Sequence, residues 1–262
     1  MQKKKKKSLK SDMQNDLNPE LIPAHVGMIM DGNGRWAQKR LMNRVKGHEQ
    51  GARTVREMVG TSHDLGVKVL TLYAFSTENW GRPKTEVSAL MHLLKKFMVN
   101  ERKELMEKDV RLNILGQVER LPDEVRKEAL ETIRMTRDNQ TMTLNLALSY
   151  GGRQDVTQAV QTLAAKAAAG EITPDQITEE MVSDHLYTAG MPDPDIIIRT
   201  SGEFRLSNFL IWQAAYSEIF ITPTLWPDFT RAEYVDILKK FQERDRRFGK
   251  VVCNTSNDGS PQ

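Results

Sequence analysis

Short apolar runs alternate along this chain with longer stretches in which apolar residues recur at helical spacing. The short runs are rich in Val, Ile and Leu and predict six β-strands, over residues 26–30, 67–75, 110–115, 142–148, 195–198 and 219–222. Strands that alternate with helices indicate βαβ units and a parallel sheet covered on both faces. We therefore expect an α/β fold, with one domain built on a central, mostly parallel six-stranded sheet flanked by helices.

The helical stretches have recognisable ends. They are expected over residues 48–65, 85–107, 172–187 and 230–246, with one more starting at Pro122 and an alanine-rich one ending near residue 169. Gly66 is expected to end the first helix at its C′ position, and Pro122 to occupy the first helical position of another. Residues 36–47 are polar and are interpreted as a connection that precedes the first long helix.

Length and charge narrow the class of protein. The 262 residues are enough for one domain with a sizeable core, and no internal repeat or linker is visible. The net charge of +3, from 38 basic and 35 acidic residues, is too mild to indicate a nucleic-acid partner. The single cysteine, Cys253, permits no internal disulfide, which suits the reducing cytoplasm. No apolar run approaches the roughly 20 residues needed to span a bilayer, and the start lacks a signal-peptide core.

The two ends of the chain differ from its middle. Residues 1–21 contain five consecutive lysines, Lys3 to Lys7, and are expected to form a disordered basic arm. A solvated tail is the simpler interpretation, and weak attraction to anionic lipid is the alternative. Residues 251–262 form a polar tail, which leaves 22–250 as the expected catalytic domain.

The loop after the first strand carries the most specific chemistry. Asp31 ends the apolar run and is followed by Gly32, Asn33, Gly34 and Arg35, before a segment that can become helical. Glycines at such a turn let backbone N–H groups approach a phosphate, and a helix N-terminus adds a positive dipole. A carboxylate beside phosphate requires an intervening cation, and Mg²⁺ is the hard, oxygen-preferring choice.

A dinucleotide site is the main alternative for this loop. Gly32, Gly34 and Ala37 match the pattern G-x-G-x-x-A, which is weak when it stands alone. Asp31 would repel a pyrophosphate bound without metal, and the acidic residue expected about 20 positions later has no candidate at the end of the second strand. Glu78 comes too late, and the G-x-x-x-x-G-K-[ST] loop of nucleotide-binding proteins is absent from the sequence.

Polar clusters follow the first, second, fourth and fifth predicted strands. In parallel sheets ligands bind beyond the carboxyl ends of the strands, so these clusters are expected to form one site. Five arginines lie in these loops, more than one diphosphate needs, and they indicate two anionic ligands: Arg35, Arg44, Arg82, Arg199 and Arg205. Trp36 and Trp80 lie in polar loops and suit binding, whereas Phe209 and Trp212 are expected to pack in the core.

The ordered set of motifs resembles the cis-prenyltransferases, most closely bacterial undecaprenyl diphosphate synthases. The motifs are H-V-G-M-I-M-D-G-N-G-R-W-A, G-H-E-Q-G, Y-A-F-S-T-E-N-W-G-R-P, Y-G-G-R, D-I-I-I-R-T-S-G-E-F-R-L-S-N-F-L-I-W-Q, E-I-F and L-W-P-D-F. The resemblance implies a homodimer with an apolar tunnel that adds isopentenyl diphosphate to farnesyl diphosphate in a Mg²⁺-dependent reaction. The implied product is undecaprenyl diphosphate, the precursor of the lipid carrier for cell-wall polysaccharides. The implied location is cytoplasmic, with at most peripheral contact at the inner face of the membrane.

The resemblance also implies roles for individual residues. Asp31 and Glu218 match metal-linked carboxylates, and Asp31 and Asn79 match catalytic residues. The positions that match substrate-binding residues are Gly32, Asn33, Gly34, Arg35, Trp36, Arg44, His48, Ser76, Thr77, Glu78, Trp80, Arg82, Arg199, Arg205, Leu206 and Ser207. The helical stripe of Val87, Leu90, Met91, Leu94 and Met98 would line the tunnel, with Ala74 at its neck.

Two questions stay open at this level. A neutral amide has no appreciable basicity near pH 7, so Asn79 is expected to orient a relay through Ser76 and His48, or to leave the proton to the released diphosphate. A non-catalytic binding subunit with the same fold would be expected to lose the metal carboxylate or the arginines, but Asp31, Arg199, Arg205 and Glu218 are all retained.

Overall fold

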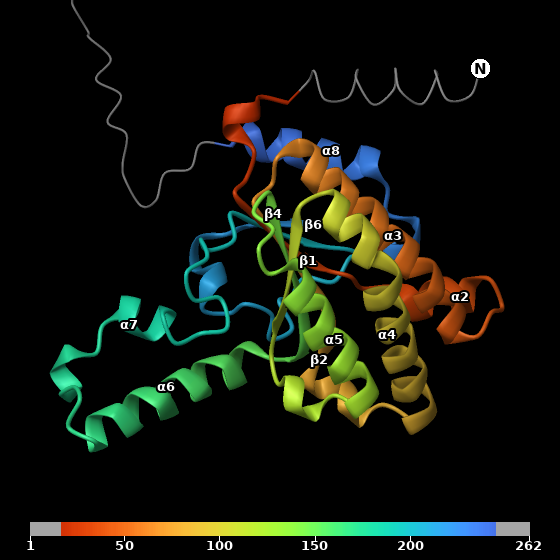
Figure 1. The fold of residues 1–262 in the computed structure, drawn as a ribbon. Coiled ribbons are helices and arrows are strands. Elements are labelled where there is room, and N and C mark those ends of the chain that lie inside the picture. The colour runs from red at the N-terminus through yellow and green to blue at the C-terminus, as the bar shows by residue number, and fades with distance from the viewer. Residues whose placement is uncertain (1–16, 245–262) are drawn as a thin grey trace, which may run out of the picture.

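The computed structural model describes residues 17–244 (Figure 1). The lysine run and the predicted polar tail lie outside the described residues. Residues 17–21, which we assigned to a disordered arm, contain the short 3₁₀ turn Pro19–Leu21, and their first two residues contact the domain. Leu17 is buried, and the amide of Asn18 donates to Gln242 Oε1 at 3.0 Å while Gln242 Nε2 donates to the Asn18 carbonyl at 2.9 Å. Burial of Leu17 and these paired bonds hold the start of the domain against the last helix.

The predicted six strands form one sheet, and every pair in it is parallel. The strands are β1 (His25–Ile29), β2 (Val69–Ser76), β3 (Val110–Leu115), β4 (Met142–Tyr150), β5 (Ile196–Arg199) and β6 (Glu218–Ile221). Their order across the sheet is β3-β4-β2-β1-β5-β6. The expected α/β architecture is therefore confirmed, and all six carboxyl ends point to one edge.

Both faces of the sheet are covered, as the near-continuous apolar strands require. The helices are α2 (Asn33–Lys39), α3 (Arg44–Leu65), α4 (Lys84–Glu107), α5 (Asp123–Thr136), α6 (Gly152–Ala168), α7 (Glu179–Ser183) and α8 (Arg231–Gln242). Helices α3, α4, α5 and α8 gather on one side of the sheet, whereas α6 and α7 project away from the body (Figure 1). The other side is covered by a smaller apolar cluster that includes Phe209, Leu210 and Ala214. All five residues of β1 and all nine of β4 are buried.

Two helix predictions need correction. Helix α3 begins at Arg44, where Asn43 caps the amide of Val45, and not at His48. Gly47, which we placed in the connection before the helix, lies inside it, and α2 packs too closely against Gly47 to leave room for a side chain. The predicted helix over 172–187 is only the five-residue α7, because Thr178 starts a new helical turn as an N-cap.

Smaller differences concern helix ends. Pro122 is the residue before α5 and not its first residue, and α8 ends at Gln242, before the predicted end at 246. Gly66 ends α3 in the left-handed conformation with φ of 88°, as expected. None of the helices within residues 17–244 is both long and apolar enough to cross a bilayer.

A chain of buried polar side chains crosses four neighbouring strands. Asn113 donates to Asn145, Asn145 donates to Thr71, and Thr71 Oγ1 lies 2.7 Å from His25 Nε2. His25 Nδ1 lies 2.7 Å from the carbonyl of Pro192, which can only accept, so the proton is on Nδ1 and Nε2 accepts from Thr71. Burial lowers the pKa of His25 to about 4, against the opposing effect of the Pro192 bond, and the ring is neutral.

Candidate active site

The loops that carry the expected site residues meet at the carboxyl edge of the sheet. Asp31 follows β1, Ser76 ends β2 and Arg199 ends β5. These strands are neighbours, with Ile29 opposite both Tyr73 and Arg199 in the register. The convergence predicted from the strand pattern is therefore present.

The glycine loop has the geometry that the sequence predicts. Gly32 adopts φ of 113°, a conformation that favours glycine, and its carbonyl accepts from the amide of Trp36 at 2.8 Å to open α2. A Cβ at Gly32 would lie 3.0 Å from the Cα of Leu225, so the loop also packs too tightly for a larger residue. Residues 32–35 line a polar cavity together with Arg44 and Arg82.

Asp31 is held between two guanidinium groups. Its Oδ2 accepts from Arg199 at 2.9 Å and lies 3.2 Å from Arg35. Burial alone would raise the pKa of Asp31, but the bond from Arg199 and the charges of Arg35 and Arg199 outweigh it and hold that pKa below its ordinary value. Asp31 is therefore a carboxylate at neutral pH, ready to face a cation.

Arg199 forms the centre of the second group of basic residues. Its side chain is only 5% exposed and donates to Asp31, to the carbonyl of Arg205 and to Ser207 Oγ at 2.8 Å. Its Nε is buried and has no hydrogen-bond partner within residues 17–244. Arg205 is more exposed and pairs with Glu203 at 2.6 Å, and Glu203 also pairs with Arg35 at 3.0 Å.

A third carboxylate holds the arginines on the other side of the glycine loop. Glu86 pairs with Arg82 at 2.9 Å and with Arg44 at 3.7 Å. Burial, followed by the positive charge of Arg82, lowers the pKa of His48 to about 4, although Glu86 opposes the shift. His48 is therefore neutral at pH 7 and is a weak base there.

The loop after β2 is locked by its own hydrogen bonds. Asn79 Oδ1 accepts from the amide of Ser76 at 3.3 Å, which closes the short 3₁₀ turn Thr77–Gly81. Trp80 packs edge-on against Phe75 with ring centroids 4.9 Å apart, and its Nε1 donates to Ser149 at 2.9 Å. Asn79 lines an apolar cavity and also a second polar cavity, which Asp31, Arg199 and Ser207 line, so this turn joins the two.

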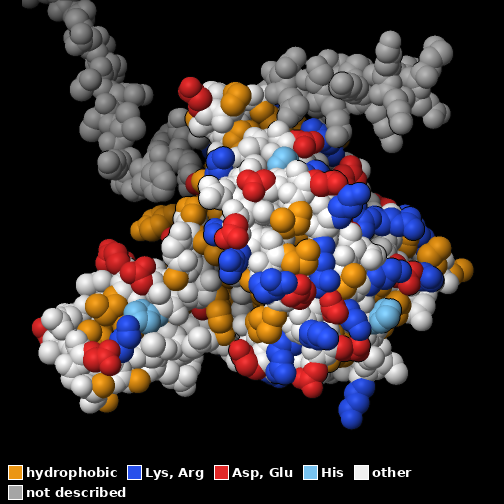
Figure 2. Space-filling model, in the orientation of Figure 1, with side chains coloured by type: hydrophobic (Ala, Val, Ile, Leu, Met, Phe, Trp, Pro, Cys, Tyr) orange, Lys and Arg blue, Asp and Glu red, His pale blue; other side chains and the backbone are white. Residues whose placement is uncertain are grey.

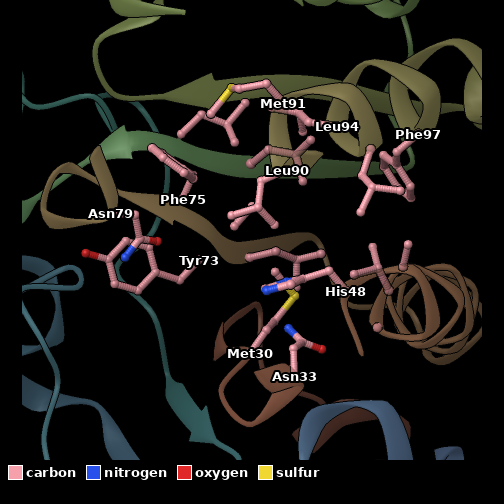
Figure 3. A pocket seen from close by; sticks show the side chains of 18 of the residues that line it. Met30, Asn33, His48, Tyr73, Phe75, Asn79, Leu90, Met91, Leu94 and Phe97 are labelled. Atoms are coloured by element: carbon pink, nitrogen blue, oxygen red, sulfur yellow. The ribbon is translucent and has the colours of Figure 1, made fainter. Parts of the chain in front are cut away.

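An apolar cavity opens from the polar site and runs between the sheet and α4 (Figure 3). Leu90, Met91, Leu94 and Phe97 project into it from α4, opposite Asn33 and His48 at its polar end (Figure 3). Ala74 lines it as expected. Val87 and Met98 do not line this cavity; Met98 is buried in the core, and Val87 is partly buried and packs against that core.

Several expected site residues lie elsewhere. Trp36 donates to Asp228 at 2.7 Å with Arg40 stacked 4.1 Å above its ring, and Leu206 packs against the smaller apolar cluster. Phe209 is fully buried in that cluster as expected. Trp212 is not core but is partly buried, and donates to Ser183 at 3.0 Å, which anchors α7.

Glu218 is not brought to Asp31 within the chain. It begins β6 opposite Ile196, whereas Arg199, which holds Asp31, lies opposite Ile221 at the other end. Position 218 and position 221, which lies opposite Arg199, are three residues apart along β6, a distance of about 10 Å. Glu218 instead pairs with Arg244 at 2.7 Å.

Sequence reasoning missed two residues of the site. Tyr73 lines both cavities, stacks on Phe209 and donates to the carbonyl of Ser207 at 3.2 Å. Asn208 donates to Glu78 at 3.1 Å and accepts from the amide of Arg153 at 2.8 Å, which ties three loops together. Asn208 directly follows the matched residues Arg205, Leu206 and Ser207 in the sequence, which could have drawn attention to it. It adopts the left-handed conformation, with φ of 65°.

The donor set fits one hard divalent ion shared with a ligand. No group of three His, Cys, Asp or Glu side chains that could hold a metal is found among the described residues 17–244. Mg²⁺ commonly binds through one or two carboxylates together with phosphate oxygens and water, so Asp31 alone is a sufficient protein ligand beside a diphosphate. Its carboxylate lies at the glycine loop, where such an anion would be held.

Comparison with known proteins decides the family. Residues 29–249 match a family model described as "Putative undecaprenyl diphosphate synthase". The chain belongs to this family. The resemblance drawn from the motifs is thereby confirmed, and with it membership of the cis-prenyltransferases.

Individual relatives of the family cover nearly the whole chain. An isoprenyl transferase of Chlorobaculum tepidum is 50% identical over 231 residues, or 88% of this chain and 87% of the relative. The ditrans,polycis-undecaprenyl-diphosphate synthase ((2E,6E)-farnesyl-diphosphate specific) of Micrococcus luteus is 48% identical over 246 residues, or 94% and 98%. Lavandulyl diphosphate synthase from Lavandula x intermedia, solved in complex with dimethylallyl diphosphate, superposes with a TM-score of 0.86 at 36% identity and covers 88% of this chain and all of its own.

Proposed function

We propose that this protein elongates farnesyl diphosphate by repeated cis addition of isopentenyl diphosphate, giving undecaprenyl diphosphate. The observation that carries the proposal is the Asp31 carboxylate between two arginine groups, with an apolar cavity opening from the same place. A diphosphate head and a prenyl tail need these two environments side by side. Family membership supports the same reaction.

Two groups of residues would bind the two diphosphates. Residues 32–35, with Arg44 and Arg82, line one polar cavity and would hold the allylic diphosphate whose tail enters the apolar cavity. Arg199, Arg205 and Ser207 lie on the other side of Asp31 and would hold the isopentenyl diphosphate. Holding the two partners in line provides a large share of the rate acceleration.

Asp31 would hold Mg²⁺ together with diphosphate oxygens. The ion would neutralise the negative charge that develops on the departing diphosphate. Arg35 and the backbone amides of the glycine loop would stabilise the same charge from fixed positions, which requires no reorganisation during the reaction. The positive charge on carbon would then be quenched by the isopentenyl double bond.

The final proton is proposed to go to the released diphosphate, with Asn79 in a positioning role. Asn79 Oδ1 is already engaged by the amide of Ser76, and the amide is not basic. His48, with a pKa of about 4, would be a weak acceptor at neutral pH. Ser76 and His48 would then orient the substrate and not carry the proton.

We further propose a homodimer formed through the β6 edge of the sheet. Ile219 of β6 is 47% exposed, and Tyr216, in the turn before this strand, is 75% exposed; large apolar residues at a sheet edge suit an interface. If Glu218 serves a metal site, the geometry requires that the site belong to a second copy, since its own Asp31 lies at the opposite level of the sheet. We also propose that the protein acts in the cytoplasm, that its product is the precursor of the cell-wall lipid carrier, and that it does not bind nucleic acid.

The test is incubation with farnesyl diphosphate, labelled isopentenyl diphosphate and Mg²⁺, followed by chromatographic sizing of the products. Long polyprenyl products are expected, and they should disappear on addition of EDTA. Asp31→Ala should lower the rate by at least about a hundredfold, because the metal and Arg199 lose their shared partner. Asp138→Ala, at an exposed carboxylate remote from the site, is the matched control and should elongate normally. Undiminished elongation by Asp31→Ala would refute the proposal.

A further inference from the structure

The turn between α2 and α3 exposes apolar side chains at the edge of the molecule. Residues 38–44 are seven consecutive exposed positions. Leu41 is 98% exposed, more than any other large apolar residue that the structure describes, and its neighbour Met42 is 48% exposed. The turn projects beyond α2 (Figure 1), and the same edge shows an apolar patch bordered by basic side chains (Figure 2).

The backbone shows that leucine is a costly residue at this position. Leu41 adopts φ of 54°, the left-handed conformation that glycine or asparagine adopts with little strain. The amide of Leu41 donates to Gln38 and that of Met42 to Ala37, which together close the end of α2. Glycine would close the same turn with less strain and without exposing an apolar side chain. Strained residues tend to occur at functional positions, so leucine here indicates binding.

Basic residues surround the apolar pair. Residues 32–48 contain five arginines and lysines and no acidic residue. Arg40 and Lys46 pair with the exposed carboxylates of Asp228 and Glu49, and such pairs are weak. Arg44 lies 3.7 Å from the more buried Glu86. Lys39 forms no ion pair within residues 17–244. Such a border complements an anionic surface.

The turn also lies on the rim of the site. Gln38 and Arg44, on either side of Leu41, line the polar cavity that adjoins the glycine loop. Trp36, partly exposed behind them, adds the amphipathic aromatic residue that is typical of membrane interfaces. A surface that contacted this turn would therefore lie next to the entrance of the site.

We infer that residues 38–46 dock the protein onto a bilayer that contains anionic lipid, with Leu41 and Met42 entering the interface. The inference takes only the lipid nature of the product from the proposed function. A convex tip of two apolar side chains buries too little area for a stable protein interface, but it suits insertion between lipid headgroups. The basic border selects anionic over zwitterionic lipid.

Vesicle binding of the full chain tests the inference without substrate. We expect the protein to co-sediment with phosphatidylcholine vesicles containing phosphatidylglycerol, and less with pure phosphatidylcholine. Leu41→Gly should bind the anionic vesicles about tenfold more weakly, because one buried leucine is lost. Its thermal unfolding temperature should not fall, since glycine suits the left-handed turn, and its turnover in detergent should stay normal. Leu130→Gln, at a 52% exposed residue of α5, is the matched control and should bind like the parent.

Three results would overturn the inference. The first is parental vesicle binding by Leu41→Gly, and the second is no vesicle binding by the parent protein. The third is a change of oligomeric state in Leu41→Gly by sedimentation, which would assign the turn to a protein interface. Since binding needs no substrate and turnover in detergent needs no vesicle, failure of this inference and failure of the proposed function are distinguishable.

Discussion

Gly47→Ala tests how closely the phosphate loop depends on packing between α2 and α3. A Cβ at Gly47 would lie 2.8 Å from the carbonyl carbon of Asn33, closer still to its oxygen, and 3.3 Å from the Cβ of Ala37. Carbon atoms prefer separations of about 3.5–4.0 Å, so Asn33 and the start of α2 must move by roughly 1 Å. Asn33 follows Gly32 directly in the loop, so the displacement reaches the candidate diphosphate site.

The expected loss of activity is large and the expected loss of stability is small. A misplacement of about 1 Å can lower a rate by roughly 10²-fold. Alanine gains about 1 kcal/mol of helix propensity over glycine, which offsets part of the roughly 1–3 kcal/mol that overpacking costs. We therefore expect kcat/KM for farnesyl diphosphate to fall about a hundredfold while the free energy of unfolding falls by no more than about 2 kcal/mol.

Gly60→Ala is the matched control in the same helix. A Cβ there would meet only the end of the flexible Lys108 side chain, at 3.2 Å. The variant should therefore be more stable by up to about 1 kcal/mol, with normal kcat/KM. Steady-state kinetics and denaturant unfolding of both variants measure these outcomes. Parental kcat/KM in Gly47→Ala would show that the loop does not depend on this contact.

Three further predictions concern the cavity, the arginine cluster and acid stability. Ala74→Leu, in the wall of the apolar cavity, should shorten the products seen by chromatography, and an unchanged length distribution would remove Ala74 from the path of the chain. In Arg199→Lys the lysine cannot bond to Asp31 and Ser207 at the same time, so KM for isopentenyl diphosphate should rise at least about tenfold in steady-state assays. An unchanged KM would contradict the assignment of Arg199 to the isopentenyl diphosphate site. In the folded protein His25 is neutral with a pKa of about 4, whereas its pKa in the unfolded chain is about 6.5. The unfolded state therefore binds the proton first as the pH falls, and the free energy of unfolding should decrease by up to roughly 3 kcal/mol between pH 6.5 and pH 4. Denaturant unfolding across this pH range should show a smaller loss of unfolding free energy in His25→Gln than in His92→Gln, which alters an exposed residue. Equal losses in the two variants would show that His25 does not cause the acid destabilisation.

The strands could be predicted because their signal is local. The alternating apolar residues Val110, Leu112 and Ile114 indicate a strand by their spacing alone, and β3 has the predicted bounds of 110–115. Parallel pairing then places all the loops that follow the strands at one edge, so the site could be located before any contact was known. The same logic placed Asp31, Ser76 and Arg199 together.

The failures arose where a residue acts through a distant neighbour. Gly47 has the local character of a helix breaker, and only its contact with Asn33 explains why a helix contains it. The metal role of Glu218 stays a prediction, because a motif does not say which end of a strand a side chain occupies, and Glu218 lies at the end remote from Arg199. Asn208 has little local signal because its role lies in bonds to Glu78 and to the start of α6.

The three carboxylates that pair with the arginines have a consequence for substrate capture. Asp31, Glu86 and Glu203 each neutralise guanidinium groups of the site, so these arginines are already held by negative charges. Entry of a diphosphate is thus an exchange of one anion for another, and the side chains need little rearrangement to receive it. A singly charged anion gains little from such an exchange, so the site would discriminate against chloride and acetate and still admit a multiply charged head group.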